Sequence, residues 1–202
     1  MSRYTGSIHK KSRRLGFSLL ENDSEFSKGK KRKSAPGQHG ANMRKLSGYG
    51  EQLQEKQKMA YLYGLNDRQF RRLFKIAQSM KGPLTLNLFI VLESRLDNMI
   101  FRMGFAPTRR SARQIVNHGH VLVNGKKCNI PSKIVELNDE ISIAEASKKL
   151  KVVEDGEKNT KFNFVNVDYK TKKGSYIRFP NRDELPADIN EAYVVEWYKR
   201  LV

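Results

Sequence analysis

The positive charge of this chain is concentrated in its first 110 residues. Residues 1–50 carry 12 basic and 3 acidic side chains, and residues 51–110 carry 11 and 5, so together they hold +15 of the formal net charge of +18. Charge that served only solubility would be spread more evenly. The asymmetry predicts one surface that faces a polyanion and another that meets a different partner, and a charged globule without special function is the alternative.

Length and apolar content limit the fold and the location. With 202 residues and 38% hydrophobic residues, the chain suffices for one large domain or two small ones. Its longest apolar run, Leu88–Leu92, is far shorter than a membrane span, and Met1–Gly6 contains no apolar segment of a secretory signal. The single cysteine, Cys128, excludes an intrachain disulfide and a multi-cysteine zinc site, and we expect it to be a small buried hydrophobe. We therefore expect a soluble intracellular protein.

The first 50 residues are typical of a mostly irregular basic arm. Apolar residues are sparse, seven glycines interrupt the segment, and residues 28–33 form a basic run. Such a segment buries too little apolar surface to order alone, but it can order against nucleic acid. A disordered tail or a localisation signal is the alternative. The candidate anchors of the arm are Tyr4, Phe17, Leu19, Leu20 and Phe26.

Helical periodicity follows the arm. One helix is expected over residues 51–63, and a second after an N-cap at Asn66 or Asp67. The apolar residues of the second recur at the spacing of a buried face: Phe70, Leu73, Phe74 and Ala77. Its basic residues fall mostly on the opposite face, which would be presented to anions: Arg68, Arg71, Arg72 and Lys75. Gly82-Pro83 ends it, and a further apolar helical face extends from Leu86 to Met103.

A further helix is expected between an N-cap at Thr108 and a stop at Gly119. Arg109, Arg110 and Arg113 crowd its first turns, where the helix dipole disfavours cations. A bound phosphate would relieve this conflict, because it attracts both the arginines and the free N–H groups of the helix start. A solvated helix face is the alternative.

The rest of the chain predicts short strands and a returning tail. Asn124-Gly125 and Asn138-Asp139 mark two turns in a strand region. In residues 162–179 apolar and polar residues alternate, which predicts a β-hairpin. Residues 146–160 are typical of a linker or an exposed helix. A helix capped by Asp188 or Asn190 follows, with a core-facing side of Ala192, Val195, Trp197 and Tyr198. The predicted fold class is α+β.

Three segments, residues 92–98, 109–114 and 119–125, resemble the RNA-binding module of ribosomal protein S-four, tyrosyl-tRNA synthetases and some pseudouridine synthases. Shorter segments and single residues resemble the bacterial S-four ribosomal family along the whole chain, namely residues 3–6, 12–14, 36–40, 49, 53, 55–58, 63–64, 68–71 and 189–191. The resemblance implies two helices packed on a small curled sheet, with the arginine-bearing helix facing RNA. It also implies a helical lobe over 1–92, joined by the tail 175–202, and the module with a β-hairpin extension over 93–174.

The resemblance implies a non-enzymatic constituent of the small ribosomal subunit in the cytoplasm. It would bind a multi-helix junction in the 5′ domain of small-subunit ribosomal RNA as a primary assembly protein. It would also lie at the channel through which messenger RNA enters, contact neighbouring proteins that include S-five, and influence translational accuracy. No membrane or small-molecule substrate is expected.

Charge, motif position and resemblance together give a set of candidate RNA-binding residues. Tyr4 and Tyr49 could stack on bases or belong to a small core. The RNA candidates are Arg3, Tyr4, Arg13, Arg14, Lys30, Lys31, Arg32, Lys33, Gln38, His39, Arg44, Lys45, Tyr49, Lys56, Lys58, Arg68, Arg71, Arg72, Arg95, Arg102, Arg109, Arg110, Arg113, Gln114, His118, Asn124 and Lys126. The candidates for protein contact are Asp188, Asn190 and Glu191.

No cofactor is expected. Some bacterial members of the family hold zinc with cysteines near the N-terminus, but this region has none, which implies the zinc-free form. His118 and His120 are a weak metal pair, expected to point to opposite sides of the strand start. No catalytic constellation is recognisable. An RNA-modifying enzyme would need a catalytic domain for which the chain has no space, and a free-standing RNA chaperone would resemble the module alone.

Overall fold

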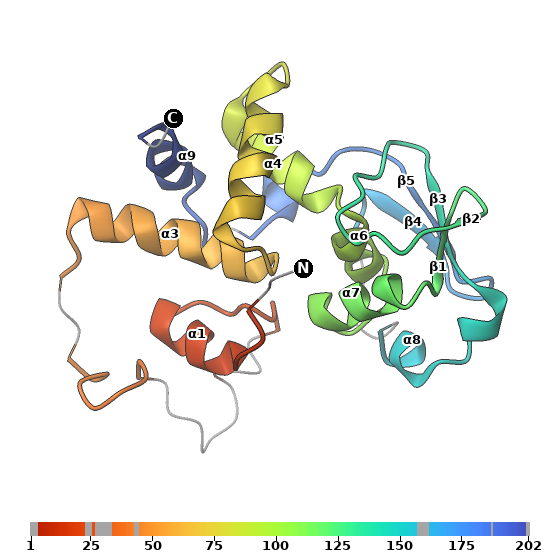
Figure 1. The fold of residues 1–202 in the computed structure, drawn as a ribbon, viewed down its shortest axis with the longest axis horizontal. Coiled ribbons are helices and arrows are strands. Elements are labelled where there is room, and N and C mark those ends of the chain that lie inside the picture. The colour runs from red at the N-terminus through yellow and green to blue at the C-terminus, as the bar shows by residue number, and fades with distance from the viewer. Residues whose placement is uncertain are drawn as a thin grey trace. The chain divides into compact units, whose positions relative to one another are not determined.

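The computed structural model describes residues 4–22, 26, 34–42, 45–156, 162–186 and 188–200. Six RNA-binding candidates lie outside these residues: Arg3, Lys30, Lys31, Arg32, Lys33 and Arg44. The chain divides into two compact units, Met1–Thr85 with Pro186–Val202 and Leu86–Leu185, whose elements are labelled in Figure 1. The expected domain bounds, 1–92 with 175–202 and 93–174, stay a prediction.

The first unit is helical. It contains α1 (Ile8–Leu15), α3 (Gly48–Leu62), α4 (Asp67–Ser79) and α9 (Glu191–Lys199). The tail helix α9 packs along α3 and also reaches α4, where the ring of Tyr198 stacks on Phe70 at 5.2 Å between centroids and lies 5.0 Å from Phe74. The expected return of the tail to the helical lobe therefore has a physical cause, which is aromatic burial.

Residues 8–19 correct the expectation of an irregular arm. They form α1, which ends at Gly16 with a left-handed φ of 61°, followed by a turn that buries Phe17 and Leu19. The backbone N–H of Leu19 donates to the Ser12 hydroxyl at 3.4 Å, and Gln54 of α3 donates to the carbonyl of Leu15 at 3.3 Å. These anchors hold the segment against α3, because a few large apolar side chains suffice when a partner helix is close.

The predicted boundary of α4 is confirmed at its start. Asn66 is the N-cap, and its side chain and that of Gln69 form a reciprocal capping box. The predicted apolar face is buried, and it comprises Phe70, Leu73, Phe74 and Ala77. The helix ends at Ser79, three residues before Gly82, whose φ of 112° requires glycine.

The expected continuous apolar helical face from Leu86 to Met103 is interrupted. The structure has α5 (Leu84–Glu93) and α6 (Leu96–Arg102), with a break between them. The N–H groups of Leu96 and Asp97 donate to the carbonyls of Lys133 and Pro131 at 2.8 and 3.1 Å. A distant loop thus satisfies donors that would otherwise continue the helix, and a local pattern gives no sign of it.

The helix α7 (Arg109–Asn117) has the predicted ends. The Thr108 side chain accepts from the N–H of Ser111, and the two side chains form a capping box. His118 is the C-cap, and Gly119 follows with a φ of 74°. The positions of both ends follow from local capping chemistry, which sequence alone reveals.

The second unit is completed by a five-stranded antiparallel sheet of order β2-β1-β3-β5-β4. The strands are β1 (Val121–Val123), β2 (Lys126–Lys127), β3 (Glu140–Ile143), β4 (Val165–Asp168) and β5 (Lys173–Tyr176). The β4–β5 hairpin adds to the module's sheet because β5 pairs with β3. One apolar core joins α6, α7 and the sheet, with Cys128 partly buried against it. The α+β class is confirmed.

Two further expectations differ in detail. The charged segment after β3 forms η1 (Glu145–Ser147) and α8 (Lys151–Gly156), which buries Val153 in the core of the unit. A short turn, η3 (Arg182–Glu184), precedes the tail. Asn190, one of the two expected caps, caps α9, but Ala192 is exposed rather than core-facing. Within the described parts of the chain, no helix has the length and hydropathy of a membrane span.

Candidate nucleic-acid interface

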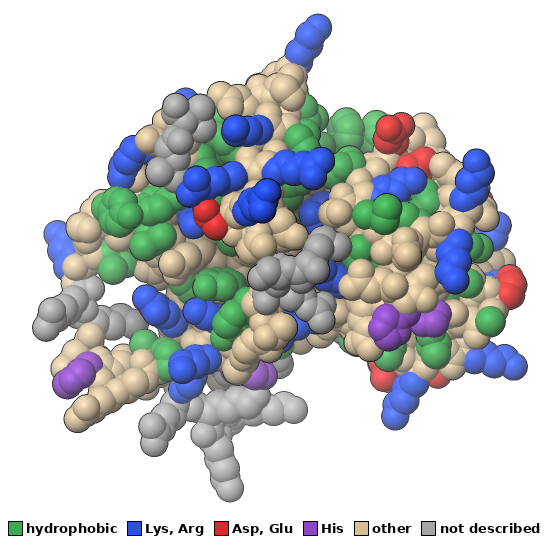
Figure 2. Space-filling view, viewed as in Figure 1, with side chains coloured by type: hydrophobic (Ala, Val, Ile, Leu, Met, Phe, Trp, Pro, Cys, Tyr) green, Lys and Arg blue, Asp and Glu red, His purple; other side chains and the backbone are tan. Residues whose placement is uncertain are grey.

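The exposed face of α4 is a basic surface of the helical unit. Its predicted basic residues lie at the surface, and Figure 2 shows Lys and Arg side chains gathered over this helix. All four are exposed: Arg68, Arg71, Arg72 and Lys75. The opposite face is anchored by Phe70 and Phe74, so the cations project from a rigid element. A fixed row of cations on a helix suits the evenly spaced phosphates of RNA.

One carboxylate organises the start of this face. Asp67 accepts from Lys56 at 2.6 Å, from Arg71 at 2.8 Å and from the Tyr198 hydroxyl at 3.2 Å. Burial raises the pKa of Asp67, but its interactions with Lys56, Arg71 and Tyr198 together outweigh this and bring the pKa below its ordinary value. Burial, with the charge of Asp67, also raises the pKa of Tyr198 far above its ordinary value. Lys56 and Arg71 thus have a protein anion beside them.

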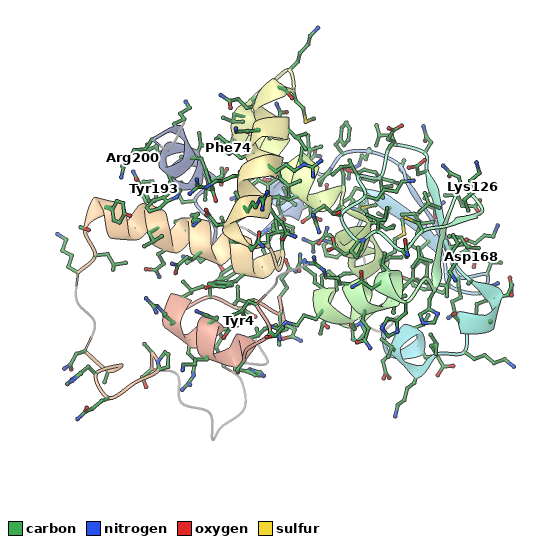
Figure 3. All side chains as sticks on the ribbon, in the orientation of Figure 1. Tyr4, Phe74, Lys126, Asp168, Tyr193 and Arg200 are labelled. Atoms are coloured by element: carbon green, nitrogen blue, oxygen red, sulfur yellow. The ribbon has the colours of Figure 1, made fainter. Side chains whose placement is uncertain are left out.

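Other candidates on α3 are also engaged within the unit. Lys58 donates to Glu55 at 2.6 Å. Tyr49 is exposed, but its ring lies 4.8 Å from that of Trp197 and 5.7 Å from the guanidinium of Arg200, near the end of α9 (Figure 3). Of the two alternatives for Tyr49, this contact agrees with a small aromatic core. The side chain is still 56% exposed, so ring surface remains for a partner.

The arm contributes an exposed loop and an aromatic pair. The Lys11 ammonium lies 5.0 Å from the ring of Tyr4 and 4.8 Å from the ring of Tyr61, so Tyr4 belongs to a cation–π cluster within the unit. In the loop at residues 36–40, Gly40 approaches the carbonyl of Ala35 so closely that a Cβ there would collide with it. The exposed candidates of the arm are Arg14, Gln38, His39 and Lys45, and Arg13 is partly exposed.

In the second unit, the start of α7 carries the candidate cations. Arg110 and Gln114 are exposed, and Arg109 is half-buried. The guanidinium of Arg109 lies 4.5 Å from the ring of Phe101, and its Nε donates to the Asn98 side chain at 2.8 Å. The capping box satisfies the N–H of Ser111 within the protein, so this donor of the helix start already has a partner.

Three arginine candidates are not at the surface, which contradicts their assignment to RNA. Arg95 and Arg102 are each 2% exposed, and Arg113 is 5% exposed. Arg95 donates twice to Asp97, at 3.1 and 2.8 Å, Arg102 donates twice to Glu93, both at 2.8 Å, and Arg113 lies 3.8 Å from Asp97. An enclosed guanidinium needs a nearby carboxylate, and these three already have one.

The last candidates lie around the β1–β2 hairpin. Lys126 is exposed beside the turn (Figure 3), whereas the Asn124 side chain bonds to Asp139 at 2.7 Å and to the N–H of Glu140 at 2.9 Å. The rings of His118 and His120 lie 5.9 Å apart, so the expectation that they point to opposite sides is wrong. His120 instead bonds to the Ser147 hydroxyl at 2.7 Å, because η1 folds beside it.

Two residues that sequence reasoning did not select take part in these surfaces. Lys11 holds Tyr4, and Asn98 holds Arg109. Neither carries a sequence signal. Lys11 completes its cluster with Tyr61, which lies 50 residues further along the chain, and Asn98 and Arg109 lie on different helices.

The three protein-contact candidates lie at the start of α9. Asp188 is exposed, and Glu191 is partly exposed. Asn190 caps the helix through the N–H groups of Ala192 and Tyr193, and its own N–H donates to Glu55 at 3.0 Å. Among the residues that the structure describes, no group of three or more His, Cys, Asp or Glu side chains could hold a metal ion.

Two family models match the chain. Residues 3–93 match the ribosomal protein S4/S9 N-terminal domain, and residues 94–141 match the S4 domain. The chain is 70% identical over 202 residues to the small ribosomal subunit protein uS4 of Malacoplasma penetrans, with all of both chains covered. It is 61% identical over 203 residues to that of Ureaplasma urealyticum, again with all of both chains covered. It is 59% identical over 203 residues to that of Mycoplasma pneumoniae, with 99% of both chains covered. The chain belongs to the uS4 family of small ribosomal subunit proteins, which are structural proteins and not enzymes.

Proposed function

We propose that the chain is a primary RNA-binding protein of the small ribosomal subunit, and that it binds a multi-helix junction in the 5′ domain of small-subunit ribosomal RNA. The observation that carries the proposal is the exposed basic face of α4, which lies on a different compact unit from the arginines at the start of α7. Two separate cationic surfaces suit a site where several RNA helices converge. Family membership supports a cytoplasmic location within the subunit.

The mechanism is neutralisation of phosphates. Where RNA helices meet, their phosphates repel one another, and this repulsion opposes compaction. The net charge of +18 would lower it, with Lys and Arg replacing condensed counterions at the junction. Binding would thereby favour the compact junction, which is how an early protein nucleates assembly. The exposed loop around His39 would contribute a close backbone approach to phosphate.

A salt titration tests this function. The full chain is bound to a transcript of the 5′ domain, and affinity is followed by filter binding from about 50 mM to 200 mM KCl. A protein with several phosphate contacts should lose affinity steeply as salt rises, on the order of a thousandfold for six contacts. A flat dependence contradicts the electrostatic mechanism. Equal affinity for a scrambled transcript of the same length contradicts recognition of the junction.

The proposal extends to the acidic start of the tail helix. Asp188 and Glu191 would meet a neighbouring ribosomal protein, S-five, near the channel through which messenger RNA enters, and through that contact influence translational accuracy. Reversal of both charges to Lys should change misreading in reconstituted subunits more than it changes RNA affinity. A loss of RNA affinity without any change in misreading would assign these residues to RNA.

We also propose that the protein works without zinc. The fold of the arm supports this, because Phe17 and Leu19 anchor it by burial. Treatment of the purified chain with a strong zinc chelator should leave RNA affinity and thermal stability unchanged. A fall in either would show that a metal contributes.

A further inference from the structure

The buried polar cluster behind the start of α7 contains a carboxylate, Glu93, that holds both a guanidinium and an amide. Glu93 is fully enclosed, and Arg102 donates to both of its oxygens at 2.8 Å. The Asn98 amide also donates to Glu93, at 2.6 Å. Because the Nδ2 of Asn98 is committed to Glu93, the orientation of its amide is fixed and its Oδ1 must point away.

That Oδ1 accepts the Nε–H of Arg109 at 2.8 Å. The ring of Phe101 lies 4.5 Å from the same guanidinium. A hydrogen bond at Nε fixes the rotation of the guanidinium plane, and an aromatic ring on one face fixes its tilt. Asn98 is 2% exposed and so lies beneath the surface, whereas Arg109 is partly exposed.

We propose that Asn98 is a positioning residue, which transmits the rigidity of the buried Glu93–Arg102 pair to Arg109 and so presents the Arg109 guanidinium to RNA in a preset orientation. This inference rests on the proposed function, since it takes Arg109 to contact phosphate. A side chain of arginine's length loses rotamer freedom when it is immobilised on binding, and this loss weakens the complex. Where the protein has already immobilised the side chain, the loss is removed from the binding step.

The proposal predicts that two substitutions affect RNA affinity and its salt dependence differently. Asn98→Ala releases Arg109 but keeps its charge, so RNA affinity should fall about threefold to tenfold while the slope against salt stays unchanged. Arg109→Ala removes the phosphate contact itself, so affinity should fall and the slope should decrease by about 0.7–0.9. Asn166→Ala, on the exposed edge strand β4 of the same unit, is the matched control and should leave both quantities unchanged.

A double-mutant cycle distinguishes positioning from simple loss of structure. In the Arg109→Ala background, Asn98→Ala should have no further effect on affinity for the 5′-domain transcript, because there is no guanidinium left to orient. If Asn98→Ala lowers affinity equally with and without Arg109, the positioning role is wrong and Asn98 only supports the fold. If Asn98→Ala does not fold, the cycle is repeated with Phe101→Leu in its place, which removes the ring on Arg109 but keeps an apolar side chain.

The failure of this inference differs from the failure of the proposed function. If the unmodified chain shows no salt-dependent binding, the function is wrong. If it binds but Arg109→Ala has no effect, Arg109 does not touch RNA and its positioning by Asn98 is refuted. If Arg109→Ala weakens binding and the cycle is additive, the function stands and the positioning role of Asn98 is refuted.

Discussion

A guanidinium group at the surface can neutralise a phosphate, whereas an enclosed one must be neutralised by the protein itself. Arg102 is an enclosed guanidinium, and Arg110 is a surface one. Arg102 is 2% exposed and bound to both oxygens of Glu93, and Arg110 is exposed on α7. Substitution of Arg102 or its partner should therefore act on stability, and substitution of Arg110 on RNA affinity.

The Glu93–Arg102 pair gives the first prediction. Glu93→Gln keeps the shape of the side chain but leaves a buried cation without its carboxylate, so the free energy of unfolding of the second unit should fall by about 3–5 kcal/mol. Glu140→Gln removes one partner of the exposed pair with Lys173, whose side chains are 52% and 53% exposed, and should cost far less stability. Urea denaturation measures both. Equal costs would show that burial does not decide the strength of these pairs.

Tyr176 gives a pH-dependent prediction. Burial raises its pKa to about 12, although its hydrogen bond with Ser94 lowers it. An unfolded tyrosine ionises near pH 10, so the stabilisation is fully present below about pH 10 and is lost as pH rises from about 10 to 12. Between about pH 9 and pH 11 the unmodified chain should lose roughly 1 kcal/mol more stability than Tyr176→Phe. Parallel losses in urea denaturation at the two pH values would contradict this.

The arginines also show how far the sequence could predict the site. Residue type and clustering identified the exposed cations Arg110, Arg71 and Arg72, because charge on a helix face follows from periodicity. The same criteria selected Arg95 and Arg102, which are buried. Their carboxylate partners are close in sequence, but whether a pair is enclosed depends on residues far along the chain, and only the fold reveals it.

At the scale of elements, helix ends were predictable where capping chemistry is local. Thr108 and Asn66 cap their helices as their side chains predict. The break between α5 and α6 was not predictable, because carbonyls from residues 131–133 satisfy the first N–H groups of α6. The helix in the arm was missed because its burial depends on α3, which begins 33 residues after α1 ends.

The cap of α7 gives an element-scale prediction. Thr108→Ala removes an acceptor for the N–H of Ser111 and half of the capping box, which costs about 1 kcal/mol and frays the turn that carries Arg109 and Arg110. RNA affinity should fall severalfold. Asn190→Ala removes the equivalent bonds at the start of α9 and should cost similar stability with little effect on RNA affinity. If the two variants lower RNA affinity equally in filter binding, RNA affinity does not depend on the order of α7.

At the scale of the whole molecule, the net charge of +18 could act in two ways. It could attract RNA as a diffuse field, in which case any cation would matter equally. It could instead act through fixed surfaces, in which case only cations at those surfaces release counterions on binding. In the first case the slope of log affinity against log salt does not depend on which charge is removed, and in the second case it does. Two variants with the same net charge but different removed cations therefore distinguish the two cases.

The last prediction compares two such variants. One replaces the basic residues of α4 with glutamine: Arg68, Arg71, Arg72 and Lys75. The other replaces four exposed lysines of the second unit that no motif assigns to RNA: Lys149, Lys151, Lys170 and Lys173. Each phosphate that no longer meets a cation should lower the salt slope by about 0.7–0.9, so the α4 variant should have a slope about three units shallower and the matched variant a nearly unchanged one. If both slopes fall alike in filter binding, RNA is held by the diffuse field, and the basic face of α4 is not a binding surface.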